Sequence, residues 1–232
     1  MKMKARLVWS ALFSLALLLG SIEAVAQSTP TVIKGKKIYT VTNGTIENGE
    51  ILIEDGKIKQ VGTKVNAPAG ARELSAEVVI PGMIDAHSHG ALDRSSQGRI
   101  PGPVTSEWKA VEHFNPNDPM IPIALSGGVT SMITRSGSGI ISSGQAVAVK
   151  LRSDPSGEPA LNAAWAFRNG TPEQEALKML TLHAAEMAGM EDRIGSIDVG
   201  KDADFMILEG HPFDYRVLPQ MVFIDGELVF RT

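Results

Sequence analysis

The chain has 232 residues, of which 43% are hydrophobic and 21% are charged, and its formal net charge is -4. This composition is typical of a globular protein and unlike that of a disordered or fibrous one. The acidic balance leaves no basic stripe for nucleic acid, and a sequence without cysteine restricts metal ligands to His, Asp, Glu and Lys.

Residues 1–26 have the pattern of an export signal. A leader with Lys2, Lys4 and Arg6 precedes an apolar run, and Ala24-Val25-Ala26 supplies small residues for cleavage. The apolar run is shorter than the roughly 18 residues that indicate a membrane span, and no later stretch reaches that length. We therefore expect an exported chain, periplasmic or secreted, with no membrane span in its mature form.

Residues 27–80 read as a series of strands. Short β-branched runs are separated by Asn43-Gly44 and Asp55-Gly56, dipeptides that favour tight hairpins. The same pattern returns in residues 193–232, where Asp225-Gly226 divides "QMVFIDGELVF". We expect the two ends of the chain to form parts of one composite β-sandwich.

The intervening residues 81–192 carry helical signals as well. Thr171 and Gln174 have the spacing of a capping box, Pro172 occupies the first helical position, and Leu177 and Leu180 begin a helical repeat. Residues 135–144 are a loop by composition. The expected layout is a β-domain that is split by an α/β insertion.

The stretch "VVIPGMIDAHSHG", residues 78–90, contains the most informative spacing. In a strand, alternate side chains share a face, so Asp85, His87 and His89 would point the same way, with the imidazoles about 6.5–7 Å apart along the chain. Two such rings can converge on one cation. An alternative is a pair of histidines that hold no ligand.

These residues resemble the first barrel strand of the metal-dependent amidohydrolase superfamily, which includes imidazolonepropionase-like and hydantoinase-like enzymes. "GGVTSM", residues 127–132, is similar to the second-strand segment of that superfamily. "ALKMLTLHAAEMAGMEDRIGSIDVGKDADFMIL", residues 176–208, resembles its closing helix and its return to the β-domain.

The resemblance implies a TIM-like (β/α) barrel with metals at the C-terminal ends of its strands, joined to a β-sandwich. His87 and His89 match the paired metal ligands, and Asp154 in "VKLRSDPSGEP" is similar to the last-strand Asp that binds metal and accepts the proton. It also implies a divalent metal, zinc, that activates water to hydrolyse a non-peptide C–N bond, for example in a cyclic amide, of a small-molecule substrate. As an alternative, Asp154 is a turn residue in Asp-Pro-Ser-Gly.

Length limits the barrel. A complete one takes about 250 residues, whereas at roughly 30 residues per βαβ unit residues 81–192 hold three or four strand–helix steps. We expect a truncated barrel, with an internal deletion between about Val147 and Ser153, that retains one metal site at best.

The other candidates point to structural roles. We expect His113 and His211 to be structural or exposed, and His183 to be a packed helix residue. Lys150 matches no motif for a bridging lysine. The S-x-x-K string that starts at Ser106 lacks its companion motifs and is interpreted as coincidence.

Two alternatives to an active monomer stay open. The first is a catalytically inactive remnant of the family, or a binding module. The second is a homo-oligomer in which two half-barrels cover each other's open strand edges.

Overall fold

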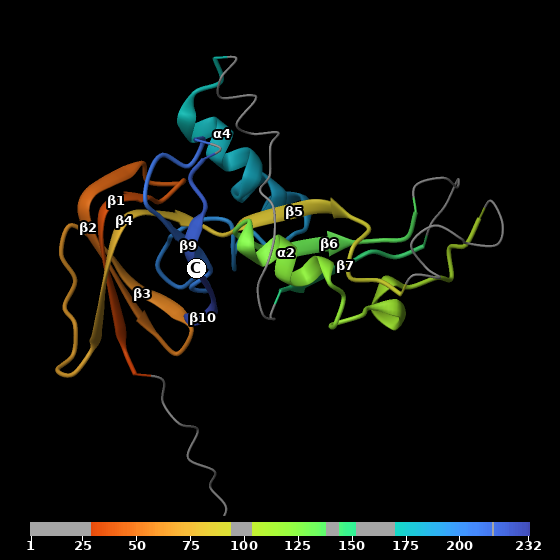
Figure 1. Cartoon of the computed structure of the whole chain (residues 1–232), viewed down its shortest axis with the longest axis horizontal. Helices are drawn as coiled ribbons and strands as arrows, with labels where there is room; N and C mark the ends of the chain where they lie inside the picture. The colour runs from red at the N-terminus through yellow and green to blue at the C-terminus, as the bar shows by residue number, and fades with distance from the viewer. Residues whose placement is uncertain (1–28, 94–103, 138–143, 152–169, 215) are drawn as a thin grey trace, which may run out of the picture.

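The computed structural model describes residues 29–93, 104–137, 144–151, 170–214 and 216–232. These residues form a mixed α/β fold with a large and a small β-sheet flanked by short helices (Figure 1). Within these ranges no helix is both long and apolar enough to cross a bilayer. The export signal expected in residues 1–26 lies outside the described residues.

The elements follow one another along the chain as strands with a few helices between them. The strands are β1 (Thr31–Tyr39), β2 (Thr45–Glu54), β3 (Lys57–Gly62), β4 (Arg72–Pro81), β5 (Met83–Ser88), β6 (Val129–Thr134), β7 (Val147–Lys150), β8 (Phe205–Leu208), β9 (Pro219–Ile224) and β10 (Glu227–Arg231). The helices are the 3-10 helix η1 (Ala110–His113), α2 (Met120–Ser126), α4 (Glu173–Leu180) and α5 (Leu182–Met187).

The large sheet combines both ends of the chain. Its strand order is β10-β9-β8-β4-β1-β2-β3, so β4 lies between β1, to which it is parallel, and β8, to which it is antiparallel. The turns Asp55-Gly56 and Asp225-Gly226 form the predicted hairpins, because both residues of each turn have the positive φ that a type I′ turn requires.

The tips of these two hairpins meet. The carbonyl of Gly56 accepts a hydrogen bond from the Ala203 amide at 2.8 Å, and the Gly226 amide donates to the Ala203 carbonyl at 3.0 Å. A Cβ on Gly56 would lie 2.9 Å from the Asp225 carbonyl oxygen, so this close approach of the two hairpins needs glycine.

The large sheet packs around an apolar cluster that includes the stacked rings of Phe205 and Phe223, whose centroids are 4.7 Å apart.

The small sheet has the order β5-β6-β7. Strands β5 and β6 are parallel and are connected through α2, as in a βαβ unit. The chain passes from the large sheet to the small one at Gly82, whose amide donates to the Asp204 carbonyl at 3.1 Å. A Cβ on Gly82 would lie 2.2 Å from Oγ1 of Thr130 on β6, so glycine permits this close crossing.

Strand β7 corrects one expectation. The resemblance of the segment around Asp154 to the last barrel strand implied a barrel strand just before Asp154, and β7 is indeed a strand. However, β7 pairs antiparallel with β6, with Ser131 opposite Lys150 and Thr134 opposite Val147. A barrel strand would run parallel to its neighbours. Alternation of side chains is the same in both directions, so the sequence pattern could not reveal the difference.

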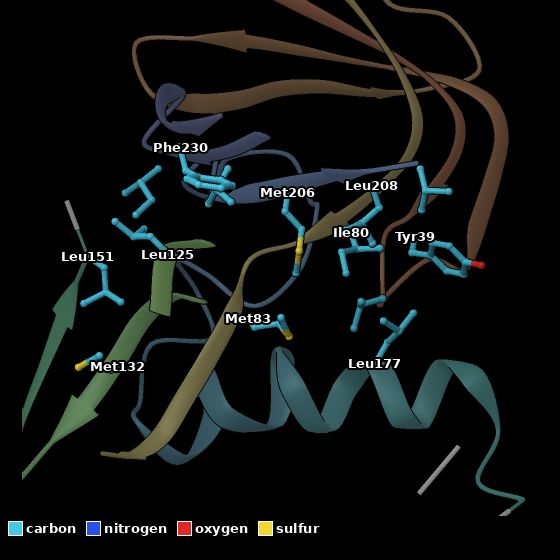
Figure 2. Close-up of a cluster of buried hydrophobic side chains, with 14 of the residues drawn as sticks. Tyr39, Ile80, Met83, Leu125, Met132, Leu151, Leu177, Met206, Leu208 and Phe230 are labelled. Atoms are coloured by element: carbon cyan, nitrogen blue, oxygen red, sulfur yellow. The ribbon is translucent and has the colours of Figure 1, made fainter. Parts of the chain in front are cut away.

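A shared core joins the two sheets. Figure 2 shows Tyr39, Ile80 and Leu208 of the large sheet facing Leu177 of α4, with Met83 of β5 beside them. Leu125, Met132 and Leu151 extend the same cluster into the small sheet. The two layers are therefore packed on each other through apolar side chains.

The predicted helix is present but differs in detail. It breaks at Thr181, which separates α4 from α5 and whose hydroxyl donates to the Leu177 carbonyl at 2.8 Å. The expected capping box does not form: Pro172 is the N-cap, no side chain caps the helix, and the amide of Gln174 instead contacts Thr45 at 3.4 Å. Contact with the large sheet has replaced the local interaction.

Candidate active site

The conspicuous histidine pair lies at the C-terminal end of β5. His87 is within the strand and exposed, and His89 is just beyond it and half-buried. Their ring centroids are 5.2 Å apart and the rings are nearly perpendicular. Asp85, which was expected to share a strand face with the two histidines, accepts the amide hydrogen of His87 on its Oδ1 at 3.1 Å. The two imidazoles are close enough to act on one ligand.

The end of β6 fixes the state of His89. Nδ1 of His89 lies 3.0 Å from the Arg135 carbonyl oxygen. A carbonyl only accepts hydrogen bonds, so Nδ1 carries the proton and the lone pair of the neutral ring is on Nε2. The Arg135 amide donates back to the Ser88 carbonyl at 3.0 Å. Metal-binding histidines commonly have this arrangement, in which the ring N–H that does not bind the metal donates to a carbonyl.

The pair fits part of a metal site. Catalytic zinc in proteins usually has three protein ligands. Across the described ranges no group of three or more His, Cys, Asp or Glu side chains is placed to hold a metal ion. Asp154, the predicted third ligand and proton acceptor, lies outside the described residues. The two imidazoles therefore supply two ligands at most from this part of the chain.

The other three histidines do not join the pair. His113 stacks on Trp108 with ring centroids 4.8 Å apart, and Nε2 of His211 lies 2.8 Å from Oε1 of Glu173. Both are consistent with the predicted structural roles. His183 was expected to be packed but is exposed on α5, whose buried face is formed by Ala184 and Ala185.

A buried ionic cluster is the feature that the sequence analysis missed. Nζ of Lys150 lies 2.6 Å from Asp202 and 3.1 Å from Asp204, and it also contacts Asp225. Burial opposes the charge of Lys150, but the three carboxylates outweigh it and raise the pKa of the ammonium group. Only the recurrence of Asp in "GKDADF" hinted at such a cluster.

This ionic cluster is not a bridging-lysine site. Lys150 is opposite Ser131, near the beginning of β6, whereas Ser88 is opposite Thr134 at the end of that strand. The cluster and the histidine pair thus lie at opposite ends of the small sheet. Lys150 links the small sheet to the large one, in agreement with the expectation that it does not replace a metal-bridging lysine.

A polar groove of about 410 Å³ lies on the large sheet. Its charged lining residues include Lys34 and Lys36 of β1 and Glu77 of β4. Lys34 pairs with Glu73 at 2.7 Å, and Lys36 pairs with Glu77 at 2.6 Å. The lysine charges in this groove are therefore already compensated, and the groove does not include the histidine pair.

Comparison with known proteins finds a family match over part of the chain. Residues 123–229 match the family described as "Amidohydrolase family". An amidohydrolase from Thermotoga maritima has the same fold, with a TM-score of 0.78 and 20% identity over 87% of this chain and 100% of the other. The resemblance to the amidohydrolase superfamily that the sequence predicted is confirmed by this family match, which covers just under half of the chain. The fold of Escherichia coli guanine deaminase is less similar to that of the present chain, with a TM-score of 0.55, 11% identity and coverage of 88% of this chain and 100% of the deaminase.

Curated relatives match this chain over short segments. The 5-methylthioadenosine/S-adenosylhomocysteine deaminase of Pyrococcus furiosus is 44% identical over 59 residues, which is 25% of this chain and 14% of the relative. The dihydroorotase of Geobacter sulfurreducens is 42% identical over 60 residues, 25% of this chain and 14% of the relative. The N-acetylglucosamine-6-phosphate deacetylase of Mus musculus is 40% identical over 63 residues, which is 27% of this chain and 14% of the relative. The chain thus covers about one seventh of the length of each.

Proposed function

We propose that this amidohydrolase is an exported hydrolase that cleaves a non-peptide C–N bond of a small molecule, such as a cyclic amide, with the help of a divalent metal. The observation that carries the proposal is the convergence of His87 and His89 at the end of β5, with the proton of His89 held by Arg135. Zinc is the metal that a set of imidazole and carboxylate ligands suits best.

The position of the pair supports a catalytic role. Strands β5 and β6 with α2 have the form of the first unit of a (β/α) barrel, and we propose that the small sheet is part of such a barrel. In barrel enzymes the active site lies at the C-terminal ends of the strands. His87 and His89 are at that end of β5, whereas the buried ionic cluster is at the other.

The chain's own residues would divide the work as follows. His87 and His89 would hold the cation through ring nitrogens, and the Arg135 carbonyl would keep His89 in the tautomer that leaves Nε2 able to bind. A bound divalent cation supplies a Lewis acid and a source of hydroxide at neutral pH. Asp154 would accept the proton of the attacking water and return it to the leaving nitrogen.

The relatives support the type of bond. Among them are a deaminase, a dihydroorotase and a deacetylase, whose names denote reactions in which water cleaves a C–N bond outside a peptide. These activities belong to those proteins. What they share, rather than any one substrate, is the basis for proposing hydrolysis of a C–N bond here.

Metal content tests the proposal. We expect the mature protein to bind about one zinc per chain. His87→Ala and His89→Ala should each abolish zinc binding, because a catalytic zinc usually needs three protein ligands and each variant removes one of them. His183→Ala, which removes an exposed histidine from α5, is the control and should leave the zinc content unchanged. Unchanged zinc content in the double variant His87→Ala/His89→Ala would contradict the proposal.

Turnover separates the active enzyme from the alternative, a non-catalytic remnant or binding module. The small sheet has three described strands, one of them antiparallel, which is the observation that favours the alternative. Zinc-loaded protein should hydrolyse at least one member of a panel of hydantoins, dihydropyrimidines, imidazolones and N-acyl amines. Zinc binding without any turnover would favour the binding module.

Two further proposals concern the state of the protein. If residues 1–26 direct export, N-terminal sequencing of protein from the periplasm or the medium should begin at Gln27. If two half-barrels cover each other, sedimentation should give a dimer. A monodisperse monomer would exclude the dimer.

A further inference from the structure

The connection from β5 to α2 runs from His89 to Pro119 and is far longer than the roughly 2–6 residues that usually join a strand to a helix in such units. It leaves β5 at the end where the histidine pair lies. In α/β enzymes, loops at this end of the strands determine which substrate is accepted. We define the substrate-facing wall as the described residues 104–120 of this connection.

Backbone hydrogen bonds hold the wall in place. Its second half returns beside the residues that follow His89: the Asp93 amide donates to the His113 carbonyl at 3.0 Å, and the Asn115 amide donates to the Ala91 carbonyl at 2.8 Å. Buried Leu92 lies in the same pairing, opposite Phe114. The wall is thereby fixed within a few residues of the histidine pair.

A second connection braces the wall. The Gln145 amide, which precedes β7, donates to the Trp108 carbonyl at 2.8 Å, and the Ala110 amide donates to the Gln145 carbonyl at 2.9 Å. A Cβ on Gly144 would lie 2.1 Å from the Trp108 carbonyl oxygen, so the two backbones are in direct contact. The connections that follow β5 and β6 are therefore joined at the end of the sheet where the histidines lie.

The wall presents apolar surface. Val104, Val111 and Met120 are 53%, 62% and 49% exposed, and half-buried Trp108 stacks on His113 with an angle of 7° between the rings. Exposed apolar side chains close to a candidate site favour a ligand with complementary apolar groups.

Met120 is the member of this set that borders the histidine pair. Its Cβ lies 3.5 Å from the place that a Cβ on Gly90 would occupy, and Gly90 directly follows His89. It begins α2, and its amide is held by Oδ1 of Asp118 at 2.9 Å. Met120 is thus positioned by the backbone and has an exposed thioether side chain next to the proposed metal ligands.

The wall lacks the features that recognise a phosphorylated or strongly acidic ligand. The positive charge of Lys109 is balanced by Glu112, whose Oε1 is 3.7 Å from Nζ, and Glu107 adds a negative charge. Recognition of phosphate usually relies on clustered cations or bidentate arginine. The described wall offers apolar contact instead.

We infer that the substrate has an apolar, aromatic or branched aliphatic substituent next to the C–N bond that is cleaved, and that Met120 is the specificity-determining residue that contacts it. This inference rests on the proposed function, because it takes the histidine pair as the site of reaction. A polarizable methionine adapts well to planar rings of different shape.

The test compares two probes that differ only in the apolar group: hydantoin and 5-phenylhydantoin. We expect the zinc-loaded wild-type protein to prefer 5-phenylhydantoin by roughly tenfold or more in kcat/KM, or in Kd by calorimetry if turnover is absent. Met120→Ala should reduce this preference by about three- to tenfold, chiefly by worsening the constant for 5-phenylhydantoin. Met179→Ala, which is equally exposed at 48% but lies on α4, is the matched control and should change neither constant.

A second variant guards against an indirect effect of Met120→Ala on folding. Gly90→Ala adds a methyl group at normal contact distance from Met120, 3.5 Å from its Cβ, and removes nothing. It should occupy part of the same space and lower the preference for the phenyl compound while the far-ultraviolet circular dichroism stays as in the wild type.

The outcomes distinguish this inference from the proposed function. A preference for the phenyl compound in binding, without turnover, supports the wall and contradicts the hydrolase. Hydrolysis of both hydantoins with equal constants, or a preference that Met120→Ala leaves intact, overturns the inference and leaves the hydrolase standing. Zinc binding with no affinity for either compound also overturns the inference.

Discussion

The ammonium of Lys150 lies 2.6 Å from Oδ2 of Asp202, in a pair whose side chains are 14% and 1% exposed. Asp202 also contacts Lys57 and receives a hydrogen bond from Arg193 at 2.8 Å. These contacts bring the end of β7, the start of β3 and the segment before β8 to one point. The link between the two layers is therefore ionic at this end and apolar in the core.

Removing Lys150 should loosen that link. In Lys150→Met the carboxylates of Asp202 and Asp204 stay buried without their main counter-charge, and we expect a loss of about 3 kcal/mol in the free energy of unfolding. Urea denaturation measures it. Lys36→Met breaks an exposed pair with Glu77 and should leave the stability nearly unchanged. If the two variants changed the free energy of unfolding equally, the buried cluster would contribute no more to stability than an exposed ion pair.

The two buried aspartates should respond to pH with opposite sign. Burial opposes ionisation of Asp202, but hydrogen bonds from Lys150 and Lys57 outweigh it and lower its pKa below 3.8. Its stabilising contribution is therefore present above about pH 3.8 and is lost as the pH falls through the lower folded-state pKa. Burial dominates at Asp204 and raises its pKa above 3.8, so the folded protein loses stability as the pH rises from 3.8 through that raised value.

Asparagine variants measured by urea denaturation between pH 3 and pH 7 would reveal these slopes. Asp202→Asn should be most destabilising at pH 7, with a deficit that shrinks below about pH 3.8. Asp204→Asn should instead gain stability relative to the wild type as the pH rises. Parallel slopes for the two variants would contradict the assigned directions of the pKa shifts.

A shared acceptor ties α4 to the large sheet. The hydroxyl of buried Tyr39 donates to Oε1 of Glu173 at 2.8 Å, and His211 approaches the same oxygen. Tyr39→Phe should lower the free energy of unfolding by about 1 kcal/mol. The loss should differ between the wild type and a His211→Ala background, because both donors compete for one oxygen. Strict additivity in this double-mutant cycle would mean that the two contacts are independent.

The crossing between the sheets should tolerate no side chain. Gly82→Ala would place Cβ within 2.3 Å of two atoms of Thr130, a stiff β-branched residue, and we expect a loss of about 1–3 kcal/mol in thermal or urea unfolding. Gly62→Ala is the matched control within a strand, since the nearest atom to its Cβ is the Lys64 carbonyl oxygen at 3.8 Å. A tolerated Gly82→Ala would mean that β5 and β6 separate easily.

Much of this structure follows from local rules, and those parts were predictable. The hairpins at Asp55 and Asp225 depend on two residues with positive φ, so the dipeptide alone indicates them. The approach of His87 and His89 depends on strand alternation over three residues. The metal they were predicted to bind stays a prediction.

What the sequence could not reveal depends on distant partners. The direction of β7 depends on its pairing with β6, which alternation does not specify. The ionic cluster brings together Lys150, Asp202 and Asp225, which no local spacing connects. The failed capping box shows the same effect, since Gln174 is drawn to Thr45. In each case a tertiary contact determined the result: it replaced the predicted local interaction at the capping box, and it produced the strand direction and the ionic cluster that no local pattern specifies.

The place of β4 in the large sheet has a consequence for how the chain folds. On one side Val79 pairs with Ile38 of β1, which precedes β4 in the chain, and on the other with Ile207 of β8, which follows only after the whole small sheet. A chain emerging from the ribosome can thus pair β4 only with β1 until β8 has been synthesised. Up to that moment β4 has one open edge, so holdase chaperones have a defined window, and a defined strand, on which to act.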